Sequence, residues 1–270
     1  MNQSTGTAEL LSIARHLASV AGDLAHTRRA EGVNIAASKS TTEDIVTHAD
    51  RETEALIRRM LADARPQDGF FGEESGAEAG TSGLTWVVDP IDGTVNYLYG
   101  IPHYAVSIAV VEGEPDPLSW RALAGVVFNP ALDEMFSASA GGGAFLGDGR
   151  IRVSTGVQPS QALVGTGFAY RADARVEQAK QLAGLLAKVR DIRRIGAASL
   201  DLCSVACGRL DAYFERGLQP WDHAAGALIA RESGARVTGF AGAPPSSDFT
   251  LAASEDLAEF LERSLLNPAG

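Results

Sequence analysis

Cysteine is scarce in this chain, and its two cysteines do not form a redox or zinc motif. Cys203 and Cys207 stand four residues apart, whereas disulfide oxidoreductases and many zinc sites use the C-x-x-C spacing. The 5 histidines include no i,i+4 pair, and no Ser-His-Asp or nucleophilic cysteine arrangement stands out. We therefore expect both cysteines to be small buried apolar residues.

The chain also lacks a basic stripe and a long apolar run. Its formal net charge is -11, which argues against broad nucleic-acid binding, because neutralising a phosphate backbone requires clustered lysine and arginine. The longest apolar stretches, such as 104–111, are too short to cross a bilayer. Residues 1–6 show no basic region leading into an apolar core, so they do not resemble a secretory signal. We expect a cytoplasmic protein without a membrane or nucleic-acid partner.

What the chain does have is the segment 89–94, Asp-Pro-Ile-Asp-Gly-Thr, directly after the apolar run 86–88. This pattern predicts a strand that ends by presenting two carboxylates, a rigid turn, a glycine and a hydroxyl at one point. Such a strand end can hold a divalent metal beside a phosphate. It is also typical of an ordinary β-turn whose aspartates satisfy local backbone donors. Taken alone, the segment leaves these two interpretations level.

Two further acidic segments decide between them. Residues 72–75, Gly-Glu-Glu-Ser, follow an apolar pair, and residues 221–226, Trp-Asp-His-Ala-Ala-Gly, lie far downstream. Each acidic residue stands where an apolar segment meets a run of small residues, which favours the end of a strand or helix. Converging carboxylates repel one another unless cations neutralise them. Three such junctions in one chain therefore indicate a metal site.

Apolar periodicity predicts a mixture of helices and strands, either α+β or α/β in two halves. We expect helices over 8–27, 47–64, 176–188, 197–207, 222–233 and 257–265, and strands over 85–88, 103–112, 122–129, 134–139 and 162–165. The glycines at 141–143 suggest a phosphate loop, but no helical pattern follows them. A hairpin connection is the better interpretation there.

The three acidic segments resemble the signature motifs of the inositol monophosphatase family of Mg²⁺-dependent, lithium-sensitive sugar phosphatases. The resemblance extends to segments 39–40, 45–50 and 211–215, and so covers nearly the whole chain. It implies alternating layers of helices and sheets with a cleft between two halves. The first half, 1–153, would carry most of the metal ligands, and the second, 154–270, would carry Asp222 and the substrate contacts.

By resemblance, Glu73, Asp89 and the carbonyl of Ile91 hold one Mg²⁺, while Asp89, Asp92 and Asp222 hold a second. Hard oxygen ligands without cysteine or histidine suit this metal. Two or three ions are expected, and Asp89 bridges two of them. Asp222 has an alternative role as the N-cap residue of a helix that it would begin, but the small residues after it favour the metal role.

Several residues are expected around these ligands. Glu74 and Lys39 are placed beside the metal cluster, although a lysine there is more often an ordinary surface cation. Asp50 completes a Thr47-x-x-Asp50 pattern that is typical of a helix capping box. The resemblance implies instead that Asp50 pairs with Thr94, beside Glu73, to orient the attacking water, and we favour that catalytic role.

The substrate contacts are predicted less directly. Gly93 and Thr94 begin a short helix whose N–H groups can bind phosphate. Glu215 matches the family position that contacts sugar hydroxyls, although a surface ion pair with Arg216 is the simpler interpretation. The segment Gly196, Ala197 and Ala198 would also contact substrate, but Ala197 lacks the hydroxyl that many relatives carry there. This departure leaves the identity of the substrate open.

These observations predict a Mg²⁺-dependent phosphomonoesterase for a small polyol phosphate, with inositol monophosphate as the best single candidate. Histidinol phosphate, fructose 1,6-bisphosphate and 3'-phosphoadenosine 5'-phosphate are alternatives, because related enzymes share the metal motifs. A regulatory protein of the same fold that contacts the transcription machinery is an alternative of another class. The resemblance also implies a homodimer.

Overall fold

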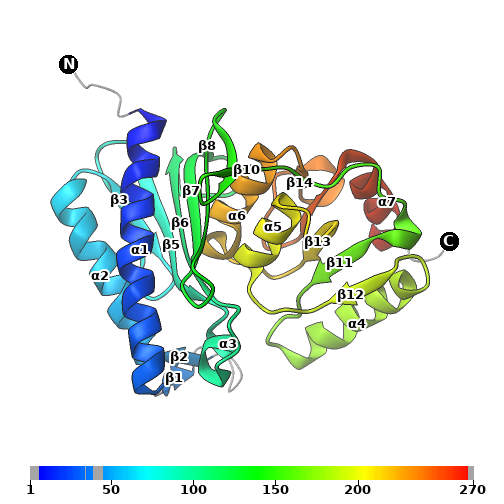
Figure 1. Ribbon diagram of the computed structural model, residues 1–270, viewed down its shortest axis with the longest axis horizontal. Helices are drawn as coiled ribbons and strands as arrows, with labels where there is room; N and C mark the ends of the chain where they lie inside the picture. The colour runs from blue at the N-terminus through cyan, green and yellow to red at the C-terminus, as the bar shows by residue number, and fades with distance from the viewer. Residues whose placement is uncertain (1–5, 34, 39–44, 267–270) are drawn as a thin grey trace.

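The protein consists of alternating layers of helices and sheets (Figure 1). The structure is a computed structural model and describes residues 6–33, 35–38 and 45–266. Helices α1 (Thr7–Glu31) and α2 (His48–Ala64) form one outer layer, and a first sheet follows. Helices α5 (Ala198–Ala206) and α6 (Pro220–Glu232) form the middle layer, and a second sheet with α4 (Ala172–Leu186) and α7 (Glu255–Leu266) completes the other side. This arrangement confirms the predicted layered α+β fold.

The first sheet is almost entirely antiparallel, and only β3 and β5 run parallel to each other. From edge to edge its strands are β10 (Gly149–Ile151), β9 (Gly143–Leu146), β8 (Glu134–Ser139), β7 (Arg121–Asn129), β6 (Ala105–Glu112), β5 (Leu84–Asp92), β3 (Gly69–Gly72) and β4 (Gly76–Glu78). Its long central strands are apolar because helices cover both faces. In β5, Trp86 and Val88 pack towards α1, while Val87 packs towards α5 and α6.

Helices α1 (Thr7–Glu31) and α2 (His48–Ala64) cover the outer face of this sheet, and α5 (Ala198–Ala206) and α6 (Pro220–Glu232) cover the inner face. Small residues let the middle layer pack closely. A Cβ atom at Gly226 would lie 2.9 Å from Leu202, and one at Gly125 would lie 3.1 Å from the Ala225 backbone. The small residues that follow Asp222 thus bring α6 directly against α5 and the first sheet.

The second sheet is mixed, with β11 parallel to both of its neighbours and the remaining pairs antiparallel. Its strands in order are β12 (Asp191–Arg193), β11 (Leu163–Thr166), β13 (Ala212–Glu215), β15 (Thr250–Ala253) and β14 (Arg236–Thr238). Helices α4 (Ala172–Leu186) and α7 (Glu255–Leu266) lie on its outer side, where they close a separate apolar cluster. The predicted boundary between residues 153 and 154 falls in the connection between the two sheets.

Shorter elements complete the chain. Strands β1 (Ile35–Ser38) and β2 (Ile45–Thr47) pair with each other, and α3 (Thr94–Tyr99) follows β5. Short 3-10 helices span Pro159–Gln161 and Phe240–Gly242. In the part of the chain that the structure describes, no helix is long and apolar enough to span a bilayer.

The predicted elements are all present, and most of them have ends that differ from the prediction. Strand β8 begins and ends where it was expected, and the glycines at 141–143 form the hairpin between β8 and β9, with positive φ at Gly141 and Gly143. Helix α6 begins at Pro220 rather than at Asp222, because proline occupies its first turn after the N-cap residue Gln219. The prediction that Asp222 begins this helix was therefore wrong. Cys203 is buried as expected, and Cys207 is partly buried.

Candidate functional site

A cleft of about 500 Å³ opens where β5, α3 and the beginnings of α5 and α6 meet. Residues from both halves of the chain line it. The residues that line it are Glu73, Asp89, Ile91, Asp92, Gly93, Thr94, Val95, Gly167, Phe168, Ala169, Tyr170, Arg171, Arg194, Gly196, Ala197, Ala198, Glu215, Arg216, Gly217, Leu218, Gln219, Trp221 and Asp222. The structure thus brings three distant acidic segments and Glu215 to one cavity.

The end of β5 turns its carboxylates into this cleft through an irregularity in the strand. Asp89 pairs with Ser107 of β6 and Asp92 pairs with Ala105, so the residues between them, which include Pro90, interrupt the regular ladder. The Oδ1 atom of Asp89 accepts a hydrogen bond of 3.0 Å from the Ile91 N–H. Both aspartates lie in this interrupted region, and both are buried.

Glu73 reaches the same point from the neighbouring parallel strand. Its N–H donates to the carbonyl of Val88 at 3.2 Å, so Glu73 follows β3 directly beside Asp89. Burial raises the pKa of Asp89 well above its usual value, and the charges of Glu73, Asp92 and Asp222 raise it further. The side chains of Glu73 and Asp89 also share a hydrogen bond. Two of the predicted metal ligands are therefore in direct contact.

Asp222 comes to the cleft from the first turn of α6. Its carboxylate accepts a 2.7 Å hydrogen bond from the N–H of Gln219, so it caps the helix from its third position. Burial raises its pKa well above the usual value, and the charges of Asp92 and Glu73 add to this effect. His223 does not line the cleft, and burial lowers its pKa to about 4, so it stays neutral beside Trp120. Adjacent residues of this helix thus face different surroundings.

The chemistry of these side chains fits Mg²⁺. The four carboxylates of Glu73, Asp89, Asp92 and Asp222 are hard oxygen donors, and the raised pKa values of the three aspartates show that negative charge is unfavourable there. A divalent cation would relieve that repulsion. Within the described residues, no three acidic, histidine or cysteine side chains stand at the spacing of a ready-made metal-binding group.

Asp50 makes both of the contacts that its sequence predicted. One carboxylate oxygen, Oδ2, accepts from the Thr47 hydroxyl at 2.5 Å and from the Thr47 N–H at 2.7 Å, which completes the capping box of α2. The other oxygen, Oδ1, accepts from the Thr94 hydroxyl at 3.4 Å. Burial raises the pKa of Asp50 to about 7, against the lowering effect of Thr47. Asp50 is therefore fixed by α2 while it contacts the beginning of α3.

Gly93 and Thr94 form the turn between β5 and α3. Gly93 has a φ of 88°, in the left-handed region that glycine adopts without strain. The Thr94 hydroxyl also lies 3.1 Å from the carbonyl of Ile91, so it has two acceptors within reach. The turn thereby places one hydroxyl between two proposed site residues.

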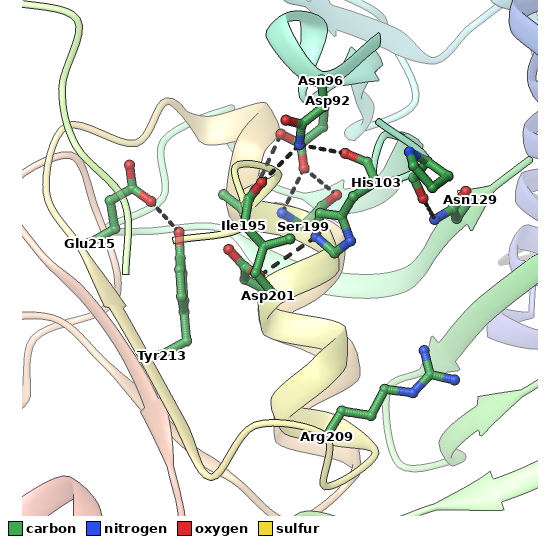
Figure 2. A network of polar contacts seen from close by, with 12 residues as sticks. Asp92, Asn96, His103, Asn129, Ile195, Ser199, Asp201, Arg209, Tyr213 and Glu215 are labelled. Carbon is green, nitrogen blue, oxygen red and sulfur yellow. Dashed lines mark hydrogen bonds and ion pairs between the residues drawn. The ribbon is translucent and has the colours of Figure 1, made fainter. Parts of the chain in front are cut away.

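Glu215 lies at the end of β13 and faces the cleft from the second half. The Tyr213 hydroxyl donates to its Oε2 at 2.5 Å (Figure 2). Burial raises the pKa of Glu215 to about 7, although the bond from Tyr213 opposes the shift. Arg216 instead lies over the ring of Phe240, 4.6 Å from its centroid, which removes the basis for a simple surface ion pair between Glu215 and Arg216.

The structure also shows residues that the sequence did not single out. The hydroxyl of Ser199 donates to Asp92 Oδ2 at 2.5 Å, beside Ala197 and Ala198. Burial raises the pKa of Asp92 to about 6, and the hydrogen bonds from Ser199 limit that shift. Asp92 and Ser199 are 107 residues apart, so no local sequence pattern connects them. The one available signal was a serine near the beginning of a predicted helix.

Two further residues support or border the cleft. Glu54 of α2 accepts a 2.8 Å hydrogen bond from the N–H of Glu74, so it anchors the backbone next to Glu73 to α2. Arg194 lines the cleft on its second-half side, near Gly196. The predicted neighbour Lys39 lies outside the described residues.

Comparisons with known proteins agree with this arrangement. The model of the inositol monophosphatase family matches residues 7–265. An inositol-1-monophosphatase of Mycobacterium tuberculosis, SuhB, is 48% identical over 248 residues, which cover 85% of this chain and 83% of that protein. The Nus factor SuhB of Xylella fastidiosa is 46% identical over 202 residues, which cover 74% of this chain and 70% of that protein.

The fold is shared as well. The crystal structure of the extragenic suppressor protein suhB from Bartonella henselae superposes with a TM-score of 0.86 at 36% identity, covering 95% of this chain and 98% of that one. The family model covers nearly the whole chain, and the acidic segments that carry the resemblance converge in one cleft. The chain therefore belongs to the inositol monophosphatase family and is a phosphoric monoester hydrolase.

Proposed function

We propose that this protein is a Mg²⁺-dependent phosphatase of small polyol phosphates, with inositol monophosphate as the best single substrate. The observation that carries the proposal is the convergence of Glu73, Asp89, Asp92 and Asp222 in one cleft, beside the turn at Gly93. Four carboxylates alone would repel a phosphate ester. Their arrangement is productive only with bound cations, which reverse the sign of the local charge.

In this proposal Glu73, Asp89 and the carbonyl of Ile91 hold one Mg²⁺, and Asp89, Asp92 and Asp222 hold a second. When bound, Mg²⁺ supplies positive charge that polarises the phosphoryl group and makes water a better nucleophile at neutral pH. Asp89 shares a hydrogen bond with Glu73, and the charges of Asp92 and Asp222 raise its pKa, which supports its role as the shared ligand. Relatives named inositol-1-monophosphatase support the choice of substrate.

The chain itself orients the attacking water. Thr94 can donate its hydroxyl proton to Asp50, which leaves the lone pairs of the Thr94 oxygen free to accept a hydrogen bond from the attacking water. A water held in this way presents its own lone pair towards the cleft. Because Asp50 is fixed by the capping box with Thr47, this acceptor is in position before substrate binds.

The phosphate group and the polyol of the substrate bind to different walls of the cleft. The N–H groups at Gly93 and Thr94 lie where the chain turns into α3 and can donate to phosphate oxygens. Across the cleft, Tyr213 already occupies Oε2 of Glu215, so Oε1 remains to accept from a substrate hydroxyl. A polyol phosphate spans these two positions, with its ester at the acidic cluster and its diol at Glu215.

The substrate panel that tests the proposal contains inositol monophosphate, histidinol phosphate, fructose 1,6-bisphosphate and 3'-phosphoadenosine 5'-phosphate. Phosphate release is measured with Mg²⁺, with EDTA and with added lithium. We expect release that requires Mg²⁺ and is fastest with inositol monophosphate. Faster release from another member of the panel would reassign the substrate, and no metal-dependent release from any of them would refute the enzyme mechanism.

A role in transcription is the second candidate, because one relative carries the name Nus factor SuhB. The strongly acidic character of this chain favours a protein partner over nucleic acid. The two roles can coexist in one chain. We also propose a homodimer, which light scattering would test: a mass near that of one chain would contradict it.

A further inference from the structure

Asp92 is held from the other half of the molecule. It ends β5 in the first sheet, but both of its carboxylate oxygens accept hydrogen bonds from the beginning of α5 (Figure 2). Oδ2 accepts from the N–H of Ser199 at 2.8 Å and from its hydroxyl at 2.5 Å, whereas Oδ1 accepts a single long bond of 3.3 Å from Ala198. Oδ2 is therefore well satisfied, and Oδ1 has capacity for a further partner.

Helix α5 has no capping side chain of its own. Its N-cap residue is Ala197, which cannot accept from the free N–H groups of the first turn. Asp92 accepts from two of those groups and so caps the helix from across the cleft. Ser199 also donates its hydroxyl to Asp92, so the cap includes a side-chain hydrogen bond. Ser199 is completely buried.

The beginning of α5 is also fixed in place. The side-chain amide of Asn96 donates to the carbonyl of His103 at 2.8 Å and to the carbonyl of Ile195 at 2.9 Å, which ties the segment before α5 to the first half (Figure 2). Asp201 of α5 also lies 3.6 Å from the ring of His103, close enough for an ion pair when His103 is protonated. Ser199 therefore approaches Asp92 from a rigid support, as residues that orient metal ligands do.

We propose that Ser199 is a positioning residue that commits Asp92 Oδ2 to α5 and thereby presents Oδ1 to Mg²⁺. The inference rests on the proposed function in one respect, which is the role of Asp92 as a metal ligand. Without the hydroxyl, the carboxylate keeps only backbone donors and can rotate about its last bond. A metal contact would then compete with the cap of α5 for the same oxygens.

The test measures Mn²⁺ binding without substrate, from the loss of the free-ion electron paramagnetic resonance signal, in the full-length protein. Ser199→Ala should bind Mn²⁺ at least about 10-fold more weakly than wild type, which is the usual loss when the partner of a metal ligand is removed. Ser204→Ala is the matched control. Ser204 is buried in the same helix, and the hydrogen bonds that it accepts from the N–H groups of Arg209 and Leu210 use its backbone carbonyl, which alanine keeps. This control should bind like wild type.

Two further readouts separate positioning from a general structural role. The Mg²⁺ concentration that half-activates phosphate release should rise in Ser199→Ala, while KM for inositol monophosphate at saturating Mg²⁺ should not change. Ser199→Thr, which keeps the hydroxyl, should recover most of the lost affinity. A folded Ser199→Thr that binds no better than Ser199→Ala would overturn the proposal.

The possible negative results would refute different parts of the proposal. If wild type itself bound no Mn²⁺, the proposed metal-dependent function would fail, and the role of Ser199 with it. If wild type bound Mn²⁺ and Ser199→Ala bound it equally well, the metal site would stand and only the role of Ser199 would be overturned. The thermal transition of each variant in EDTA shows whether it is folded before either conclusion is drawn.

Discussion

The carboxylate of Glu215 occupies the space that a side chain at Gly167 would need. A Cβ atom at residue 167 would lie 1.9 Å from Oε2 of Glu215, far inside contact distance. Gly167 directly follows β11, and Glu215 ends the neighbouring parallel strand β13. Glycine at position 167 therefore leaves Glu215 room to reach its partner Tyr213, and Glu215 in turn forms one wall of the cleft.

Gly167→Ala should displace Glu215 and weaken substrate binding. We expect KM for the polyol phosphate to rise by about 10-fold or more, because a hydrogen bond to a charged group contributes about 1.5–3 kcal/mol. The free energy of unfolding should fall by about 1–3 kcal/mol through overpacking. Gly184→Ala is the control, since no atom lies near a Cβ atom at that exposed helical position. An unchanged KM in Gly167→Ala would separate Glu215 from substrate binding.

Tyr213→Phe should change the pH dependence of substrate binding. Burial raises the pKa of Glu215 to about 7, and the Tyr213 hydroxyl opposes this by stabilising the charged carboxylate. Protonated Glu215 is a poorer acceptor for a diol, so KM at saturating Mg²⁺ should rise as the pH falls through about 7. Without the Tyr213 hydroxyl this transition should move to higher pH. A transition at the same pH in both proteins would contradict the assignment to Glu215.

Asp68 should contribute to stability in a pH-dependent way. It accepts from Arg65 at 2.8 Å and from the indole N–H of Trp86 at 2.9 Å. Burial raises the pKa of Asp68, but the hydrogen bonds from Arg65, Ser82 and Trp86 outweigh burial and hold it below its usual value. Because the folded pKa is lowered, this stabilisation is complete above the ordinary pKa of aspartate and is lost as the pH falls through the folded value.

Asp68→Asn should therefore lower the free energy of unfolding by about 1–3 kcal/mol at neutral pH, since it removes a buried charged acceptor. Urea unfolding followed by tryptophan fluorescence measures the effect. The difference from wild type should begin to shrink below about pH 4, the ordinary pKa of aspartate, and should keep shrinking as the pH falls through the lower folded value. A difference that stayed constant between these pH values would show that the charge of Asp68 contributes nothing.

Asp92→Asn should abolish turnover without loss of folding. The amide keeps an acceptor for Ser199 but loses the charge that Mg²⁺ requires, so kcat should fall by more than about 100-fold. The thermal transition in EDTA should stay at or above that of wild type, because the change removes one of several repelling charges. Near wild-type activity would remove Asp92 from the metal site.

Much of this site was visible in the sequence because acidic residues stood at the ends of apolar segments. That pattern placed Glu73 and Asp89 at strand ends, and it marked Asp222 near the beginning of a helix. The capping-box pattern at Thr47 and Asp50 is present in the structure as well. Local patterns of this kind survive folding because they depend on neighbours within one or two turns.

Other features could not be read from local patterns. The short strands β12 and β14 have too few residues to show alternation, so their pairing with β11 and β15 depends on the rest of the sheet. The contact between Asp92 and Ser199 joins residues 107 positions apart. The need for glycine at position 167 arises only when Glu215 lies opposite it. Such relationships are set by the packing of the two halves.

The most direct test of the account is the Mg²⁺ dependence of phosphate release from inositol monophosphate in wild type and in Asp89→Asn. Asp89 is the ligand assigned to both metal ions, and the charges of Glu73, Asp92 and Asp222 all raise its pKa. After treatment with EDTA, added Mg²⁺ should restore phosphate release in wild type and should not restore it in Asp89→Asn. Release that persists in EDTA, or full recovery in Asp89→Asn, would contradict a phosphatase mechanism built on these carboxylates.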